Sequence, residues 1–186
     1  MSNENSKSNG NGDNGGNGRT GKRAALSAEA KSGGERAVED VREFLEQDGW
    51  FPERMGDAAV FRVQYSGRNA TFPCFVQVRV ELEQLLVYAV CPVRTPEEAR
   101  SRVAEFITRA NYGMRIGNFE LDYDDGEVRY KTSVDFEGEP LTVRWLRGLL
   151  YPAVQTLDTY LPGLLAVAHG ERSPLDAVKL IEEADE

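Results

Sequence analysis

Clustered carboxylates near the middle of the chain are the first residues that could carry chemistry, because several carboxylates around one turn can bind a cation such as Ca²⁺. The cluster consists of Asp122, Asp124, Asp125 and Glu127. An EF-hand loop needs acidic or amide ligands at its first, third and fifth positions and glycine at its sixth. With Gly126 as the sixth residue, the first and third positions hold Leu121 and Tyr123. The pattern therefore favours an ordinary turn over a dedicated calcium site.

Catalysis by a nucleophile would need a base beside it, and the sequence has one histidine, His169, next to Gly170. No Ser or Cys motif accompanies it, so we expect a solvated loop histidine. The string from Gly16 to Lys22 has the form of a phosphate loop, but no strand precedes it, and Arg23 stands where a Mg²⁺-binding Ser or Thr belongs. No Cys/His spacing suits zinc. The sequence therefore predicts no catalytic, cofactor-binding or metal-binding residue.

The two cysteines, Cys74 and Cys91, are the remaining reactive side chains. If their strands form a hairpin around Leu82 and Glu83, the two thiols lie opposite one another and a disulfide is geometrically conceivable. A reducing cytosol and the lack of a Cys-x-x-Cys motif favour two buried thiols instead.

The charge of the chain is unevenly distributed. The chain has 22 basic and 31 acidic residues, and residues 1–33 hold five of the basic and three of the acidic ones. The remaining body is therefore strongly acidic, which argues against nucleic acid and anionic membranes as partners. No apolar run reaches the ~18 residues of a membrane span, and the first residues contain no hydrophobic signal region. We expect a cytoplasmic protein.

Composition divides the chain into two parts. Residues 1–33 are rich in Asn, Gly and Ser and almost free of large apolar residues, which predicts a disordered tail. Residues 34–186 are numerous enough to fold as one domain around a single core, without metal or disulfides.

Hydrophobic periodicity predicts the elements of the body. Helical spacing marks residues 35–48, and alternating apolar and polar side chains mark strands over residues 59–65, 72–80 and 85–90. Thr95-Pro96-Glu97-Glu98 has the form of a capping box, with Thr95 as the N-cap of a second helix.

The second half of the body predicts two strands and two more helices. Asp125-Gly126 predicts a two-residue hairpin turn that pairs Phe119 with Thr132, Leu121 with Tyr130 and Tyr123 with Val128. On the other face of this hairpin, Glu120 then faces Lys131 and Asp122 faces Arg129. A long helix from Leu141 to Leu161 should be kinked or split by Pro152, and Ser173-Pro174 starts a short last helix.

The order of elements is therefore α-β-β-β-α-β-β-α-α. Strands in hairpins with interspersed helices predict an α+β fold, in which an antiparallel five-stranded sheet carries its helices mainly on one face. The opposite face of the sheet is less polar than solvent would favour, because Phe75, Leu86, Tyr88 and Val90 all point that way. Either another helix or the tail covers them, or they form a partner surface.

Several segments resemble the central signature of YbjN-type bacterial proteins, which are grouped as sensory transduction regulators. The segments are Asn111-Tyr112-Gly113, Ile116 to Asp122 and Asp125 to Lys131. The likeness runs from about residue 36 to residue 181. It implies a fold similar to that of type III secretion chaperones, commonly dimeric, which bind extended peptides or partner proteins without catalysis. The motif brings no set of functional residues with it.

The leading hypothesis is a non-catalytic cytoplasmic module that binds proteins or extended peptides and forms a homodimer, with Phe75, Leu86, Tyr88 and Val90 as its partner surface. One alternative is an enzyme or small-ligand receptor with a carboxylate-lined pocket between the sheet and the helix from Leu141. Another is a structural or regulatory domain whose tail, residues 1–33, makes the contacts.

Overall fold

The structure is a computed structural model that describes residues 32–184. Its elements in chain order are α1 (Gly33–Gln47), β1 (Glu53–Arg54), β2 (Val60–Ser66), β3 (Thr71–Arg79), the 3₁₀ turn η1 (Val80–Leu82), β4 (Gln84–Val90), the 3₁₀ turn η2 (Glu97–Ala99), α2 (Arg100–Gly113), β5 (Asn118–Leu121), β6 (Val128–Asp135), α3 (Val143–Ala168) and α4 (Pro174–Ala184). Most of the predicted tail, including its phosphate-loop-like string, lies outside the described residues.

The helix α1 begins with a capping box. The Ser32 hydroxyl oxygen accepts a hydrogen bond from the N–H of Glu35 at 3.1 Å, and the Glu35 carboxylate accepts one from the N–H of Ser32 at 2.8 Å. These bonds satisfy two backbone donors that a helix start leaves unpaired. Gly33 is therefore the first residue of a helix.

The strands form one antiparallel sheet in the order β1-β2-β3-β4-β6-β5. The α+β fold and the antiparallel sheet are confirmed, but the sheet has six strands rather than five. The extra strand, β1, pairs Glu53 with Arg62 and Arg54 with Phe61. Two residues are too few to show any alternation, so hydrophobic periodicity could not reveal this strand.

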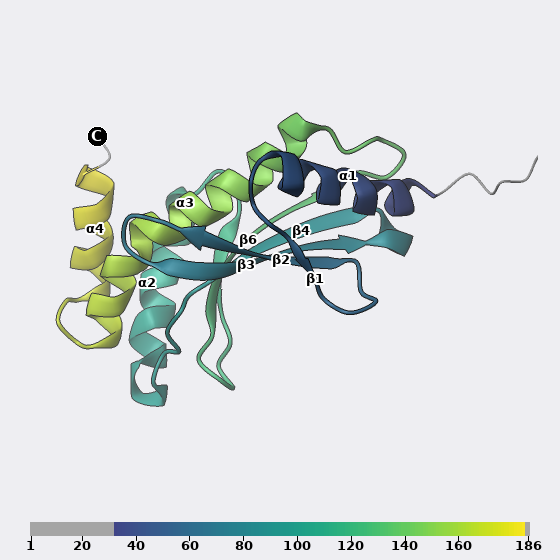
Figure 1. Cartoon of the computed structure of the whole chain (residues 1–186). Helices are drawn as coiled ribbons and strands as arrows, with labels where there is room; N and C mark the ends of the chain where they lie inside the picture. Colours follow the sequence, from purple (N-terminus) through teal and green to yellow (C-terminus); the bar gives the residue numbers. More distant parts are fainter. Residues whose placement is uncertain (1–31, 185–186) are drawn as a thin grey trace, which may run out of the picture. The chain divides into compact units, whose positions relative to one another are not determined.

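The helices cover one face of the sheet, and we call it the inner face. Figure 1 shows α1 and the long α3 lying along the same side of the strands. The inner-face side chains that are buried are Phe61, Val63, Phe72, Cys74, Val76, Val78, Leu85, Val87, Ala89, Phe119, Val128, Tyr130 and Thr132. The predicted alternation of β2, β3 and β4 is therefore confirmed.

The helix α3 is one continuous element that contains both Pro152 and Pro162. Of the two outcomes predicted at Pro152, a kink or a split, the split is thus wrong, and the helix extends to Ala168. Most of its apolar side chains are buried on the sheet and against α4, and this packing outweighs the loss of a backbone donor at each proline.

A buried aspartate of α3 holds the turn between β2 and β3. The Asp158 carboxylate accepts hydrogen bonds from the N–H groups of Arg68 at 2.7 Å, Asn69 at 3.0 Å and Ala70 at 3.4 Å. Pro162 has no N–H to pair with the Asp158 carbonyl, and the side-chain amide of Asn69 donates to that carbonyl at 2.8 Å. The turn therefore satisfies the acceptor that the proline leaves free.

The hairpin of β5 and β6 forms as predicted, but its register differs by two residues. Phe119 pairs with Tyr130 and Leu121 with Val128, rather than with Thr132 and Tyr130. A shift of two residues keeps each side chain on its predicted face. It replaces the predicted pair of Asp122 with Arg129 by a pair of Glu120 with Arg129.

The longer loop explains this register. The N–H of Asp122 donates to the carbonyl of Glu127 at 2.8 Å, and the N–H of Gly126 donates to the carbonyl of Asp122 at 2.9 Å. The loop therefore runs from Tyr123 to Gly126, and it is not the two-residue turn that Asp125-Gly126 alone suggested.

The predicted capping box at Thr95 is wrong. The first turn is the 3₁₀ segment η2, and α2 begins at Arg100 without a side-chain cap. Thr95 is buried instead, and its N–H donates to the carbonyl of Gly126 at 2.8 Å. A tertiary contact with the hairpin loop has replaced the local one.

The two cysteines are free and buried, which confirms the thiol interpretation. Cys74 pairs across the strands with Ala89 and not with Cys91, because the β3–β4 connection contains η1 and a left-handed residue at Glu83. Burial raises the pKa of the Cys74 thiol to about 12.

Candidate functional site

The candidate site is the face of the sheet opposite the helices, which we call the open face. None of the side chains that β2, β3, β4 and β6 place on this face is fully buried. The open face carries the predicted partner surface, whose residues Phe75, Leu86, Tyr88 and Val90 we call the apolar stripe. Each of the four is half-buried.

Cross-strand pairing makes the apolar stripe contiguous. Phe75 on β3 lies directly opposite Tyr88 on β4. Leu86 and Val90 lie on either side of Tyr88 along β4, two residues away, and so point to the same face. Direct cross-strand neighbours have Cβ atoms about 4.5–5.5 Å apart. The four side chains therefore form one patch.

Basic side chains flank the apolar stripe on both sides. Arg62 on β2 lies opposite Phe75, and Lys131 on β6 lies opposite Tyr88. The guanidinium carbon of Arg129 is 4.4 Å from the centre of the Tyr88 ring, a cation–π contact. The predicted partner surface did not include these cations, because only apolar residues of this face were chosen for it. Each cation nevertheless alternates with buried residues along its strand.

Glu120 on β5 shares its carboxylate between two of the cations. The Nε of Arg129 donates to one oxygen at 2.8 Å, and the Nζ of Lys131 donates to the other. Burial raises the pKa of Glu120, but the bonds from Lys131 and Arg129 lower it more, so its pKa lies below 4.5. Arg129 also lies 3.8 Å from the Glu127 carboxylate. The two cations beside Tyr88 therefore face two carboxylates.

A side chain of α2 occupies part of the outer edge of β5. The amide oxygen of Asn111 accepts from the N–H of Phe119 at 2.7 Å, and its amide nitrogen donates to the carbonyl of Phe119 at 3.1 Å. These are backbone groups that an added strand would pair with. At the other edge, β1 has only two residues and follows Pro52, which has no N–H to offer.

The other signature residues have structural partners as well. Gly126 has φ of 76°, and a Cβ atom there would lie 2.2 Å from the carbonyl oxygen of Thr95. Gly117 has φ of 77°, and its Cβ would lie 2.7 Å from the ring of Tyr130. The Tyr130 hydroxyl donates to the carbonyl of Ile116. The signature therefore builds the corner between α2, β5 and β6.

The acidic cluster in the hairpin loop also has a structural explanation. The side chain of Asp122 accepts from the N–H of Asp124 at 2.8 Å, and that of Asp125 accepts from the N–H of Glu127 at 2.8 Å. The Arg94 guanidinium lies 2.9 Å from both Asp125 and Glu127. In residues 32–184, no group of three or more His, Cys, Asp or Glu side chains is arranged to hold a metal ion.

The single histidine lies at the end of α3. His169 caps the end of α3 and is exposed, and its backbone N–H donates to the carbonyl of Leu165 at 2.9 Å. This position agrees with the expected solvated histidine.

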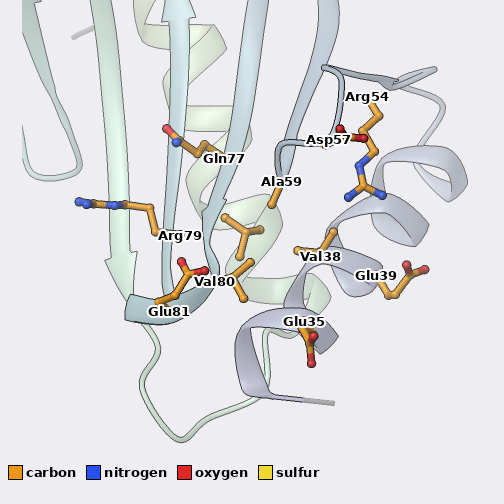
Figure 2. A pocket seen from close by; sticks show the side chains of 11 residues that line it. Glu35, Val38, Glu39, Arg54, Asp57, Ala59, Gln77, Arg79, Val80 and Glu81 are labelled. Carbon is orange, nitrogen blue, oxygen red and sulfur yellow. The ribbon is translucent and has the colours of Figure 1, made fainter.

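A cleft of about 590 Å³ lies between α1 and the ends of β2 and β3. Figure 2 shows Val38, Ala59 and Val80 in its middle, with Arg54 and Asp57 at one end. Glu35, Glu39 and Glu81 also line it. The alternative of a ligand pocket places it between the sheet and the helix from Leu141, with carboxyl groups of raised pKa inside it. This cleft lies against α1 instead. Asp40 has a pKa raised by burial and by nearby Glu43, but Asp40 does not line this cleft.

A family model described as "YbjN: Putative bacterial sensory transduction regulator" matches residues 37–166. A comparison with curated proteins finds no match. Within residues 32–184, no helix is long and apolar enough to cross a membrane.

Two solved structures are similar to this chain. The first is YbjN from E. coli, described as a putative transcription regulator, with 12% sequence identity and a TM-score of 0.52 over 72% of this chain and 93% of that chain. The second is a chain of the ExsC–ExsE complex, with 15% identity and a TM-score of 0.49 over 66% of this chain and 89% of that chain. The likeness to YbjN confirms the predicted fold.

Proposed function

The chain belongs to the YbjN family, and from this premise we propose that it is a protein-binding module that holds a partner on its open face without catalysing a reaction. The observation that carries the proposal is the apolar stripe. Its four side chains form one patch on the face that no helix of residues 32–184 covers.

Hydrophobic burial supplies the driving force for such binding. Covering apolar surface yields about 25 cal/mol per Å², before the costs of ordering the partner. Aromatic side chains at the centre of a patch contribute most of the energy of typical interfaces. Phe75 and Tyr88 occupy that central position here, with Leu86 and Val90 beside them.

The proposal is tested by capture from the native cell extract with three immobilised proteins. They are the wild type, the stripe variant Leu86→Glu/Tyr88→Ser, and the control variant Leu180→Glu/Tyr112→Ser. The control makes the same chemical changes at residues that are 53% and 97% exposed, on α4 and α2. Unfolding curves establish that all three proteins are folded.

We expect proteins captured by the wild type and the control to be reduced about tenfold or more on the stripe variant, which corresponds to about 1.4 kcal/mol. Equal capture by the stripe variant would refute the open face as the site. A loss confined to the control variant would place the site at the end of the molecule near α2 and α4.

Three earlier expectations remain predictions. If the chain forms a homodimer, sedimentation of the wild-type protein should give twice the mass of one chain. If residues 1–33 made the contacts instead, deleting residues 1–31 would abolish capture, whereas the open-face proposal predicts that capture survives. The cytoplasmic location is likewise still a prediction.

A further inference from the structure

We propose that the segment held on the open face is an amphipathic α-helix of another protein, with acidic residues on both sides of its apolar face. This inference rests on the proposed function and narrows the class of partner. Three features of the sheet support it: the position of the apolar stripe on interior strands, the placement of the cations and the distance between them.

The position of the apolar stripe argues for a helix over a strand. An extended segment satisfies its backbone by pairing with a sheet edge, and the edges of this sheet are the partly occupied β5 and, on the other side, β1 with the part of β2 from Val63 to Ser66 that β1 does not pair with. The apolar stripe lies on the interior strands β3 and β4, away from both edges. A segment that lies across the face instead must satisfy its own N–H and C=O groups, which an α-helix does internally.

The cations argue for acidic flanks. One row across the open face reads Arg62, Phe75, Tyr88 and Lys131 on four successive strands. An aromatic pair is thus bounded by a cation at each end. Arg62 contacts the exposed Glu53 at 3.3 Å. At the other end, Lys131 and Arg129 share Glu120, and Arg129 also lies 3.8 Å from Glu127. Neither end therefore carries an excess of negative charge.

The spacing of the row fits the width of a helix. Neighbouring strands lie about 4.8 Å apart, so three intervals separate β2 from β6 by roughly 14 Å. A helix with its side chains is about 10–12 Å across. A helix aligned with the strands would place its apolar face on Phe75 and Tyr88 and its two flanks against Arg62 and Lys131.

A second copy of the described domain does not supply this helix. Each of its four helices buries an apolar stripe in its own core, as the acidic helix α1 does with Val38, Val41 and Leu45. The exposed Leu175 and Leu180 of α4 lie five residues apart, about 140° around the helix, so they do not form one apolar face. Two open faces packed together would bring the flanking cations of both copies into one interface, which is unfavourable. The occupant is therefore a helix from a different protein.

The test uses synthetic probes with the full-length protein. The first probe is a fluorescent helical peptide of about 20 residues, with leucines at helical spacing and glutamates on both flanks of the leucine face. The second has lysine in place of each glutamate. The third keeps the composition of the first apart from two interior prolines, which prevent a continuous helix. Fluorescence anisotropy measures each dissociation constant.

We expect the acidic helix to bind about tenfold or more tightly than the lysine and proline probes. The variant Phe75→Ser/Tyr88→Ser should weaken its binding by about tenfold or more. Arg62→Glu/Lys131→Glu should reverse the preference and favour the lysine probe. The control Arg172→Glu/Lys179→Glu changes the net charge equally, on exposed residues near and within α4, and should preserve the preference.

Three outcomes would refute the acidic-helix inference. They are equal binding of the acidic and lysine probes by the wild type, tight binding of the proline probe, and a control variant that loses the preference for the acidic probe as Arg62→Glu/Lys131→Glu does. If capture from extract still depends on Leu86 and Tyr88 in that case, the proposed function stands alone. If the stripe variants change neither capture nor probe binding, both proposals fail.

Discussion

The corner formed by α2, β5 and β6 and the open face of β3 and β4 use their residues in opposite ways. In the corner, Asn111 binds the backbone of Phe119, and Gly126 makes room for Thr95. On the open face, Phe75 and Leu86 neither belong to the core nor receive cover from a helix.

This difference separates two kinds of information in the sequence. Many of the residues that identify the family lie in the corner, where contacts such as those of Asn111 and Gly126 account for them. The four residues of the apolar stripe lie outside the segments 111–113, 116–122 and 125–131, whereas Lys131, which we propose to flank a partner, lies within the last of them. A family signature can therefore establish a fold while leaving the partner unspecified.

The largest effect on stability is expected from a substitution at Gly126 in the corner. We expect Gly126→Ala to lower the free energy of unfolding by about 3 kcal/mol or more, because the new Cβ meets the Thr95 carbonyl at 2.2 Å and φ is positive. The matched control is Gly138→Ala, at φ of 78° with nothing within 4 Å. It should cost about 1–2 kcal/mol. Equal costs in urea unfolding would show that the contact with Thr95 does not matter.

The next effect concerns Asn111. Removing its amide with Asn111→Ala leaves the N–H of Phe119 without its partner, although the carbonyl of Phe119 still accepts from the Asn118 amide at 3.2 Å. We expect a loss of about 1–3 kcal/mol in urea unfolding. The freed β5 edge should also promote concentration-dependent association in sedimentation. A variant that is as stable and as monodisperse as the wild type would contradict the role of Asn111 in closing the edge.

The stripe variant Leu86→Glu/Tyr88→Ser should have a smaller effect on stability than either change in the corner. Both side chains are only half-buried, so we expect a change of about 1 kcal/mol or less in the free energy of unfolding. Loss of the contact between Arg129 and Tyr88 falls within that range. A loss as large as that of Gly126→Ala would mean that the open face also serves the fold.

The smallest effect lies at Glu120, which belongs to the signature and faces the open side. Its folded-state pKa is below 4.5, so its contribution to stability is present above pH 4.5 and is lost as the pH falls through the folded-state value. We therefore expect Glu120→Gln to flatten the dependence of unfolding free energy on pH in that range. At neutral pH the same variant should bind the acidic probe more tightly, because Arg129 and Lys131 lose a competing carboxylate.

Periodicity made much of this molecule predictable. Alternation in residues 72–90 placed Phe75 and Tyr88 on one face and Cys74 and Val87 on the other, because the side-chain direction of a strand repeats every two residues. The apolar stripe was therefore identified correctly as a group on one face. Whether it binds a partner remains a prediction.

Features that depend on distant contacts were not predictable. Asp125-Gly126 indicated a turn, but the register depends on the bond between Asp122 and Glu127, which no local pattern specifies. Thr95 had the pattern of a helix cap, yet its backbone pairs with Gly126. Asp158 offered a signal that was missed, since a carboxylate among the leucines of a buried helix face needs donors from elsewhere.

The clamp between α3 and the β2–β3 turn limits where foreign sequence can be inserted. Asp158 engages the N–H groups of Arg68, Asn69 and Ala70, so lengthening that turn for a tag or reporter would remove the acceptor from all of them. The bend at Gly138 has free space around it, and its neighbours Glu137 and Glu139 are exposed. Gly138 is therefore the better position for an internal label that leaves the sheet and its open face intact.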